Sequence, residues 1–295
     1  MNDRSRADGV RSIRNRTIWI LWTQGFQDAP ELVKLCLRSW KRFNPNWDVR
    51  ALDDKALKTL IDLPLPTAGR RDITPQVFSD LARLSLLRRF GGVWADATVF
   101  CCEPLDKWLE PYAREGFFAF RNPGRDRLMA TWFLAANADN QILTGLYRDY
   151  VALWEQNRFL SPRHGMARFS RRALSRLFSR NPKATLRWFG FPRTVLKIFP
   201  YYVIHYTFNK LVFSDPAVAR IWNKSVPFEA TQPRRLTELA HDPDGLATAL
   251  DMIERGASPL YKLNWRIDRD EPYWKAVLSR LRSKVETGTA AEPSF

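Results

Sequence analysis

The chain has 295 residues, of which 45% are hydrophobic and 13% aromatic, so it can bury a sizeable core as one large domain or one domain with a helical annex. Its formal net charge of +16 would attract nucleic acid, an anionic membrane surface or a polyanionic glycan. No apolar run approaches the roughly 18 residues of a transmembrane helix, so none is expected.

The N-terminal half alternates between strand and helix patterns. Residues 1–16 are polar and basic without the apolar core of a signal peptide, and we expect a flexible arm. Residues 17–22 form a β-rich apolar run, residues 30–43 have helical spacing, and residues 47–52 alternate like a second strand. The following Asp53-Asp54 pair either caps the next helix, the more frequent use, or contacts a ribose. This alternation predicts a parallel or mixed sheet.

Residues 78–100, FSDLARLSLLRRFGGVWADATVF, combine a helix, a turn and a strand. Ser79 is a plausible N-cap for a helix that has apolar residues at every third position. Gly91-Gly92 would stop this helix, and residues 93–95 would form a short buried strand. Asp96 then lies at the strand exit, where α/β sheets present their chemistry.

The same unit places two carboxylates and a guanidinium around one strand end. Asp80 and Arg83 are three residues apart and therefore lie on one face of the helix. As an isolated pair they would be explained by a surface salt bridge of a few tenths of a kcal/mol. With Asp96 nearby, the arrangement favours the binding of a metal–diphosphate.

A family resemblance follows from these residues. The order S-D-x-x-R, then G-G-x-W-x-D-x-T, resembles the DXD-containing sugar-transferase superfamily, which includes bacterial capsular polysaccharide synthesis proteins, yeast initiating mannosyltransferases and large clostridial glucosylating toxins. Asp96-Ala97-Thr98 is most similar to the capsular subset, in which threonine takes the second acidic position. The resemblance covers residues 17–156 and continues in patches, such as SPLYKLNW at 258–265.

The resemblance implies a GT-A-like fold with a Rossmann-type mixed sheet flanked by helices, and a nucleotide-sugar donor. Asp80 and Asp96 would be catalytic, with Asp80 bound to donor sugar hydroxyls and Arg83 to the sugar or diphosphate. Asp96 and Thr98 would hold Mn²⁺ or Mg²⁺, because divalent cations of this kind prefer oxygen ligands. The neutral Thr98 hydroxyl is the weaker ligand, which leaves strict metal dependence open.

The resemblance assigns three further residues, and two of them have an alternative interpretation. Trp22 either stacks on the donor base, as the resemblance implies, or is a core tryptophan. Lys262 would contact the donor phosphates. Trp132 is either an acceptor-binding sugar platform or ordinary core.

The composition changes after residue 156. No acidic residue lies between Glu155 and Asp215, and basic residues alternate with bulky aromatics. Residues 166–178 have the pattern of a basic amphipathic helix. The 158–210 stretch therefore predicts contact with an anionic membrane surface, or a solvated face over a helical subdomain. We expect residues 157–286 to form a basic, mostly helical region that completes the acceptor side, followed by a loose tail at 287–295.

The sequence thus predicts an α/β glycosyltransferase with a nucleotide-sugar-binding core at 17–156. UDP is favoured over GDP as the donor nucleotide, and the resemblance implies retention of anomeric configuration. The acceptor would be a glycan or a lipid-linked molecule in capsular or other surface-polysaccharide assembly. The enzyme would be cytoplasmic and peripherally bound to the inner face of the membrane; three cysteines without metal-ligand spacing fit a reducing compartment.

The alternative is a basic protein that binds nucleic acid or an anionic membrane without catalysis. A phosphate-binding channel does not use carboxylates, so this alternative leaves Asp80 and Asp96 unexplained, and no nucleic-acid partner is expected. A catalytically inactive membrane scaffold would be favoured by the loss of Asp96, which is present.

Overall fold

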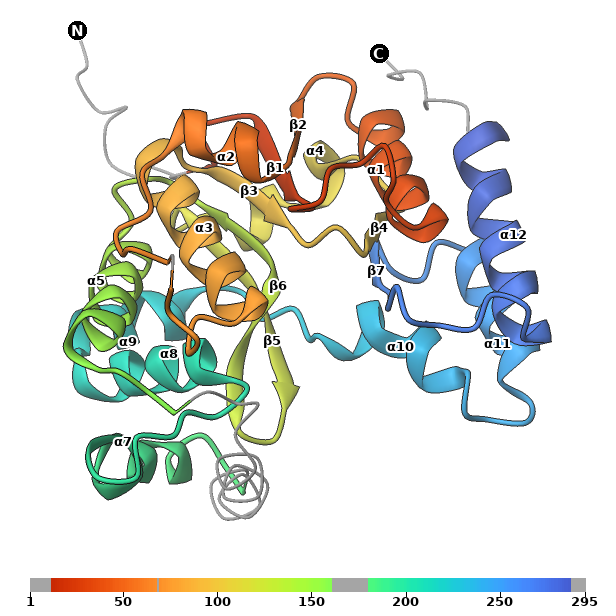
Figure 1. Cartoon of the computed structure of the whole chain (residues 1–295). Helices are drawn as coiled ribbons and strands as arrows, with labels where there is room; N and C mark the ends of the chain where they lie inside the picture. Colours follow the sequence, from red (N-terminus) through yellow and green to blue (C-terminus); the bar gives the residue numbers. More distant parts are fainter. Residues whose placement is uncertain (1–11, 68, 161–179, 288–295) are drawn as a thin grey trace, which may run out of the picture.

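The computed structural model describes residues 12–67, 69–160 and 180–287 and is built around a five-stranded mixed sheet in the order β2-β1-β3-β6-β5 (Figure 1). The strands are β1 Thr17–Leu21, β2 Asp48–Leu52, β3 Gly92–Ala95, β4 Val99–Cys101, β5 Phe117–Gly124, β6 Arg127–Ala136 and β7 Leu260–Lys262. Within the large sheet, β1 pairs in parallel with β2 and β3, whereas β6 pairs antiparallel with β3 and β5. The short strands β4 and β7 form a separate antiparallel pair. The mixed sheet flanked by helices confirms the predicted fold class.

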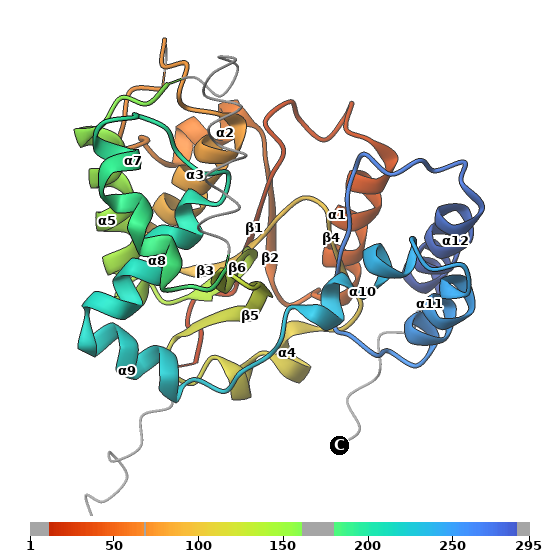
Figure 2. The ribbon, with the colours of Figure 1, turned by 90° about the horizontal axis from the view of Figure 1, so that it is seen from below.

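Helices cover both faces of the large sheet (Figure 2). The α-helices are α1 Glu31–Phe43, α2 Asp54–Leu60, α3 Pro75–Phe90, α4 Leu105–Trp108, α5 Gln141–Gln156, α7 Phe191–Thr194, α8 Val203–Ser214, α9 Pro216–Lys224, α10 Thr231–Leu239, α11 Gly245–Glu254 and α12 Pro272–Thr287, with 3₁₀ turns at η1 Glu110–Tyr112 and η2 Ala184–Phe189. Alternate strand residues face opposite layers: Trp19 and Trp94 pack toward α3 and α5, and Ile18 and Val93 pack toward α1 and α4. Burial of both faces is why β1 and β3 are almost continuously apolar, whereas the edge strand β2 is largely exposed.

The turn between α3 and β3 fixes the strand that carries Asp96. Gly91 ends α3 with a φ of 72°, and its N–H donates to Leu87 O. Gly92 has a φ of 96°, and a Cβ there would lie 2.5 Å from Thr17 O on β1. Only glycine satisfies both the left-handed backbone and this close approach. The predicted helix stop and the buried strand after it are confirmed.

The predicted start of α3 at Ser79 is wrong. The helix begins at Pro75, and the Thr74 hydroxyl caps it by accepting a hydrogen bond from the Val77 N–H at 3.3 Å. A threonine followed by proline is a favourable helix start, because proline at the first helical position sacrifices no hydrogen bond. Ser79 instead lies in the second turn, where its hydroxyl accepts a hydrogen bond from Arg83 at 3.1 Å.

The chain after residue 180 packs in two places. Helices α8 and α9 contact α5, and α8 also contacts β6, whereas α10 contacts β7 and α12 contacts α1. In Figure 1 these two groups lie on opposite sides of the sheet. The predicted domain boundaries at residues 156 and 286 stay a prediction. The described helices between them do not form one separate unit, because some pack on α5 and others pack on β7 and α1.

Several predicted features fall outside the described residues. These are most of the N-terminal arm, the amphipathic helix at 166–178 and the last eight residues of the tail. Among the helices that the structure does describe, none combines the length and apolar character needed to cross a bilayer.

Candidate functional site

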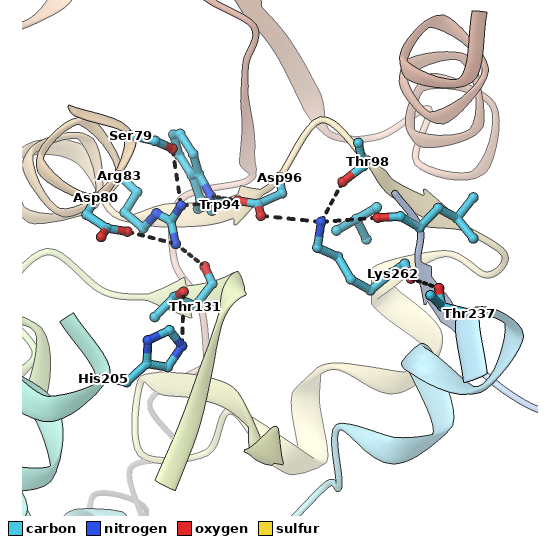
Figure 3. Close-up of polar contacts among 12 residues, drawn as sticks. Ser79, Asp80, Arg83, Trp94, Asp96, Thr98, Thr131, His205, Thr237 and Lys262 are labelled. Carbon is cyan, nitrogen blue, oxygen red and sulfur yellow. Dashed lines mark hydrogen bonds and ion pairs between the residues drawn. The ribbon is translucent and has the colours of Figure 1, made fainter. Parts of the chain in front are cut away.

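Arg83 is the centre of a polar cluster at the carboxyl edge of the sheet (Figure 3). Its guanidinium lies 3.3 Å from both Asp80 Oδ1 and Asp96 Oδ1, and it donates a 2.8 Å hydrogen bond to Thr131 O on β6. It also lies over the Trp94 ring, 5.2 Å from the centroid. The Arg83 side chain is only 6% exposed. One buried cation therefore joins α3, the end of β3 and β6.

Asp96 is the more accessible carboxylate of the cluster. Its backbone N–H donates to Trp132 O at 2.8 Å, which fixes its position just beyond β3. Its Oδ1 accepts a hydrogen bond from the Trp94 indole N–H at 3.0 Å in addition to the Arg83 contact. The side chain is 27% exposed. Asp96 is therefore held by buried neighbours on one side and open to a ligand on the other.

Lys262 reaches the same place from the other end of the chain. Its Nζ lies 2.5 Å from Thr98 Oγ1 and 3.6 Å from Asp96 Oδ2. Antiparallel pairing of Val99 with Lys262 fixes its backbone, and the Leu263 N–H donates to Thr98 O at 2.9 Å. The side chain is 24% exposed. As Figure 3 shows, the ammonium group lies between the carboxylate and the hydroxyl that the sequence assigned to a metal.

Asp80 lies behind Arg83 and is nearly enclosed. The Tyr150 hydroxyl of α5 donates a 3.1 Å hydrogen bond to Asp80 Oδ2. Burial raises the pKa of the Asp80 carboxyl to about 6, although the Arg83 charge and the Tyr150 hydrogen bond act in the opposite direction. A carboxylate that titrates near neutral pH and contacts a buried arginine is a candidate functional group.

Trp22 lies at the same sheet edge as Asp96. Strands β1 and β3 run parallel, with Ile18 opposite Val93, so both residues follow the carboxyl ends of adjacent strands. The half-buried Trp22 ring contacts Trp265 edge to face, with centroids 6.0 Å apart. Trp265 is 45% exposed. The two indoles therefore form an aromatic pair at the sheet edge from which Asp96 also emerges.

Trp132 has a different environment. It is stacked on Phe120 with centroids 4.8 Å apart and is 8% exposed. Its indole nitrogen is buried without a hydrogen-bond partner. The acceptor role of Trp132 stays a prediction, because the ring presents little surface to a sugar.

Asp53 is a helix cap. Its carboxylate accepts a hydrogen bond from the Ala56 N–H at 2.7 Å at the start of α2. This is the more frequent of the two uses that the sequence left open.

The oxygen ligands around Asp96 do not fit a divalent cation held by Asp96 and Thr98. Mn²⁺ and Mg²⁺ are bound by several oxygen ligands, usually including one or two carboxylates. Here Asp96 Oδ1 is engaged by Arg83 and Trp94, and the Lys262 ammonium occupies the space between Asp96 Oδ2 and Thr98. Within the described part of the chain, no three His, Cys, Asp or Glu side chains converge as a metal site. The manganese or magnesium cofactor stays a prediction.

The structure adds partners that the sequence did not reveal. Tyr150 and Trp265 join the site from α5 and from the segment after β7, and Trp94 becomes a hydrogen-bond donor to Asp96. Trp94 and Trp265 lie inside the two motifs already singled out, so their positions carried a signal. Tyr150 lies in an ordinary amphipathic helix and carried none.

Comparison with known proteins identifies a protein family. The family described as capsular polysaccharide synthesis protein matches residues 3–161. The relatives include the O-glycosyltransferase braB of Annulohypoxylon truncatum, 26% identical over 167 residues, which cover 48% of this chain and 38% of that protein. They also include the glycosyltransferase afumC of Aspergillus fumigatus, 28% identical over 160 residues, which cover 48% of this chain and 41% of the relative. The chain spans about two fifths of the length of these relatives.

Among solved structures, the chain is similar to the PaToxG glycosyltransferase, with a TM-score of 0.40 and 14% identity. The match covers 94% of this chain and 87% of that one.

Proposed function

Because this chain belongs to the capsular polysaccharide synthesis protein family, we propose that it is a glycosyltransferase that moves a sugar from a nucleotide-diphosphate donor to a hydroxyl of a glycan or lipid-linked acceptor. The observation that carries the proposal is the continuous line of charges Asp80, Arg83, Asp96 and Lys262 at the carboxyl edge of β1 and β3. Its two accessible members, Asp96 and Lys262, are partly exposed to solvent, and its buried members hold them in place.

The chemistry needs stabilisation of a leaving diphosphate. The bond between the anomeric carbon and the β-phosphate oxygen breaks, and its electron pair stays on that oxygen. The acceptor hydroxyl forms the new bond to carbon and loses its proton to solvent. Positive groups fixed near the leaving oxygen lower the barrier because they require no reorganisation during the reaction. Retention of anomeric configuration is part of the proposal and rests on the family resemblance alone.

The residues have distinct roles in this proposal. Lys262 and Arg83 contribute the positive charge, Asp96 fixes both cations, and Asp80 orients Arg83. A hydrogen bond from a donor sugar hydroxyl to Asp80 is part of the proposal and rests on the family resemblance alone. Trp22 and Trp265 would stack on the base, for which UDP is the first choice. The ion pairs among the four charged residues and the contact between the two indoles support these roles.

A thermal-shift panel tests the proposal. UDP, GDP, CMP and their common sugar conjugates are added to wild type and to Asp96→Ala, with and without Mn²⁺. A ligand that binds only the folded state at a hundredfold excess over its Kd stabilises it by about 2.7 kcal/mol, which raises Tm by a few degrees. One nucleotide should stabilise wild type and have a smaller effect on Asp96→Ala. No shift from any nucleotide would refute the proposal.

We also propose that the protein meets its acceptor at an anionic membrane surface, which would suit a surface-polysaccharide pathway. Large apolar side chains are exposed in the acid-free stretch, among them Phe191 at 61%, Val195 at 60% and Tyr201 at 60%. Exposed basic residues surround them in sequence: Arg158, Arg180, Lys183, Arg187, Lys197 and Lys210. Apolar and basic side chains together favour binding to anionic lipid.

Tyr201 links this surface to the charged cluster. Partial burial raises the pKa of its phenol, and the negative charges of Asp80 and Asp96 contribute to the same shift. The ring of its neighbour Tyr202 contacts the His205 ring with centroids 5.4 Å apart, and His205 Nε2 lies 3.5 Å from Thr131 Oγ1. The Thr131 carbonyl in turn accepts the hydrogen bond from Arg83. A lipid-linked acceptor bound at the surface would then be close to the donor.

Vesicle co-sedimentation tests the membrane proposal. Phe191→Ser combined with Val195→Ser should weaken binding to vesicles that contain phosphatidylglycerol, whereas Val226→Ser, at an exposed apolar position outside the stretch, should not. UDP affinity should stay the same in all variants. Equal vesicle binding by both variants, or binding to nucleic acid in place of vesicles, would contradict the proposal.

A further inference from the structure

We propose that the Lys262 ammonium takes the place of a divalent cation, so that this site binds a nucleoside diphosphate without metal. The inference rests on the proposed function and deepens it by naming the group that neutralises the diphosphate. The observation behind it is the position of Lys262 Nζ between Thr98 Oγ1 and Asp96 Oδ2, at 2.5 and 3.6 Å.

The lysine is held there by its backbone. Strand β7 pairs with β4, and the chain around Lys262 is further fixed by hydrogen bonds from Leu263 N to Thr98 O and from Thr237 Oγ1 to Lys262 O. The side chain therefore starts from a rigid two-stranded ribbon anchored on both sides. A cation preorganised in this way stabilises developing charge without reorganisation.

The charge balance of the cluster also favours a built-in cation. Two carboxylates, Asp80 and Asp96, face two cations, Arg83 and Lys262, at 3.3 to 3.6 Å. A divalent ion between Asp96 and Thr98 would lie next to the Lys262 ammonium, where like charges repel. The threonine at position 98 agrees with this assignment, because its neutral hydroxyl accepts a hydrogen bond from the ammonium without adding another negative charge.

The orientation of the ammonium leaves room for a phosphate. The Lys262 side chain is 24% exposed and Asp96 is 27% exposed, so both present part of their surface to solvent. An ammonium group has three donors. The one donor not directed at Thr98 or at Leu263 O faces Asp96 Oδ2 at 3.6 Å and can turn from it toward a phosphate oxygen, while Arg83 stays buried behind Asp96.

Calorimetric titration with UDP and GDP tests the inference in two buffers, one with EDTA and one with Mn²⁺. We expect wild type to bind one of them with a Kd that differs by less than about threefold between the buffers, a change below one kcal/mol. Lys262→Met should weaken binding by about tenfold or more in EDTA, the loss expected for one charge-assisted contact. Lys262→Arg should keep most of the affinity. Lys275→Met, at an exposed position of α12, is the matched control and should behave as wild type.

A double variant tests whether metal dependence can be introduced. Thr98→Asp combined with Lys262→Met adds a second carboxylate beside Asp96 and removes the ammonium group. This double variant should bind the nucleotide in Mn²⁺ and lose affinity in EDTA. Retained thermal unfolding cooperativity shows that the variants are folded.

The outcomes separate the two levels of the argument. Wild-type binding that requires Mn²⁺ would overturn the lysine assignment and leave the proposed function intact. No binding of either nucleotide in both buffers would overturn the proposed function and the inference with it. Metal-independent binding that Lys262→Met leaves unchanged would also overturn the assignment of Lys262.

Discussion

Replacing Arg83 with methionine removes the cation that holds two carboxylates together. Methionine keeps much of the apolar stem that packs beside Trp94, so the charge is the main loss. The Arg83 and Asp80 side chains are 6% and 10% exposed, so Asp80 would be left as a buried, uncompensated charge. Removing one partner of a buried pair costs about 3–5 kcal/mol. Tm should therefore fall by roughly 10 °C.

The pH dependence of this loss provides the sharper test. Burial raises the pKa of Asp80 in the folded protein to about 6, above its value in the unfolded chain. The stabilisation that comes from the protonated form is present below the unfolded pKa and disappears as pH rises through about 6. Removing Arg83 raises the folded pKa further, because its charge favours the carboxylate. The cost of Arg83→Met should therefore be smaller at pH 5 than at pH 8.

Urea unfolding followed by circular dichroism, at both pH values, measures these free energies. Asp80→Asn and the double variant with Arg83→Met complete the cycle, and the double variant should recover part of the loss at pH 8. A cost below about 1 kcal/mol at pH 8, typical of a surface pair, would refute the central role of Arg83. Equal costs at pH 5 and pH 8 would refute the role of the Asp80 charge.

Other predictions concern ligand binding. Trp22→Ala should weaken UDP binding by about tenfold to a hundredfold if the indole stacks on the base, at 1–3 kcal/mol per stacked base; unchanged affinity in calorimetry would make Trp22 a core residue. Affinity for the nucleotide sugar should fall as pH drops through about 6, because Asp80 becomes protonated and no longer accepts from the sugar. A flat wild-type profile would contradict this, and Asp80→Asn should be flat. The Tyr150 hydrogen bond lowers the Asp80 pKa in wild type, so Tyr150→Phe should raise that pKa and move the midpoint of the binding profile to higher pH. A midpoint that stays in place or moves lower would count against this prediction.

The part of the site that arises from local spacing was predictable from the sequence. Asp80 and Arg83 share a helix face because they are three residues apart, and the ion pair is present at 3.3 Å. Asp96 lies within reach because Gly91-Gly92 reverses the chain directly into a short strand. These relations involve few residues and a fixed backbone geometry.

Long-range contacts were less predictable. Lys262 is 164 residues from Thr98, and its position depends on the pairing of β4 with β7. The sequence motif around Lys262 suggested a phosphate contact, yet only the fold places its ammonium between Asp96 and Thr98. Tyr150 reaches Asp80 through the packing of α5 on α3, which no local pattern encodes.

The sequence placed the start of α3 wrongly and gave no specific assignment to α8, and each difference has a physical reason. Ser79 has a good capping side chain, but Thr74-Pro75 begins α3 earlier and gives it an additional turn. Residues 203–214 form α8, although their aromatic and β-branched composition has no clear helical signal. Most of this helix is buried against α5 and β6, and packing overrides propensity there.

The most direct measurement of the central claim is product formation from labelled nucleotide sugars. Wild type should release a nucleoside diphosphate and transfer the sugar to water or to an added acceptor, and Asp96→Asn should lose most of this activity while it remains folded. Release of the nucleoside diphosphate by wild type and not by Asp96→Asn would support a transferase site at Asp96. Equal release by both proteins, or no release from any nucleotide sugar, would contradict it.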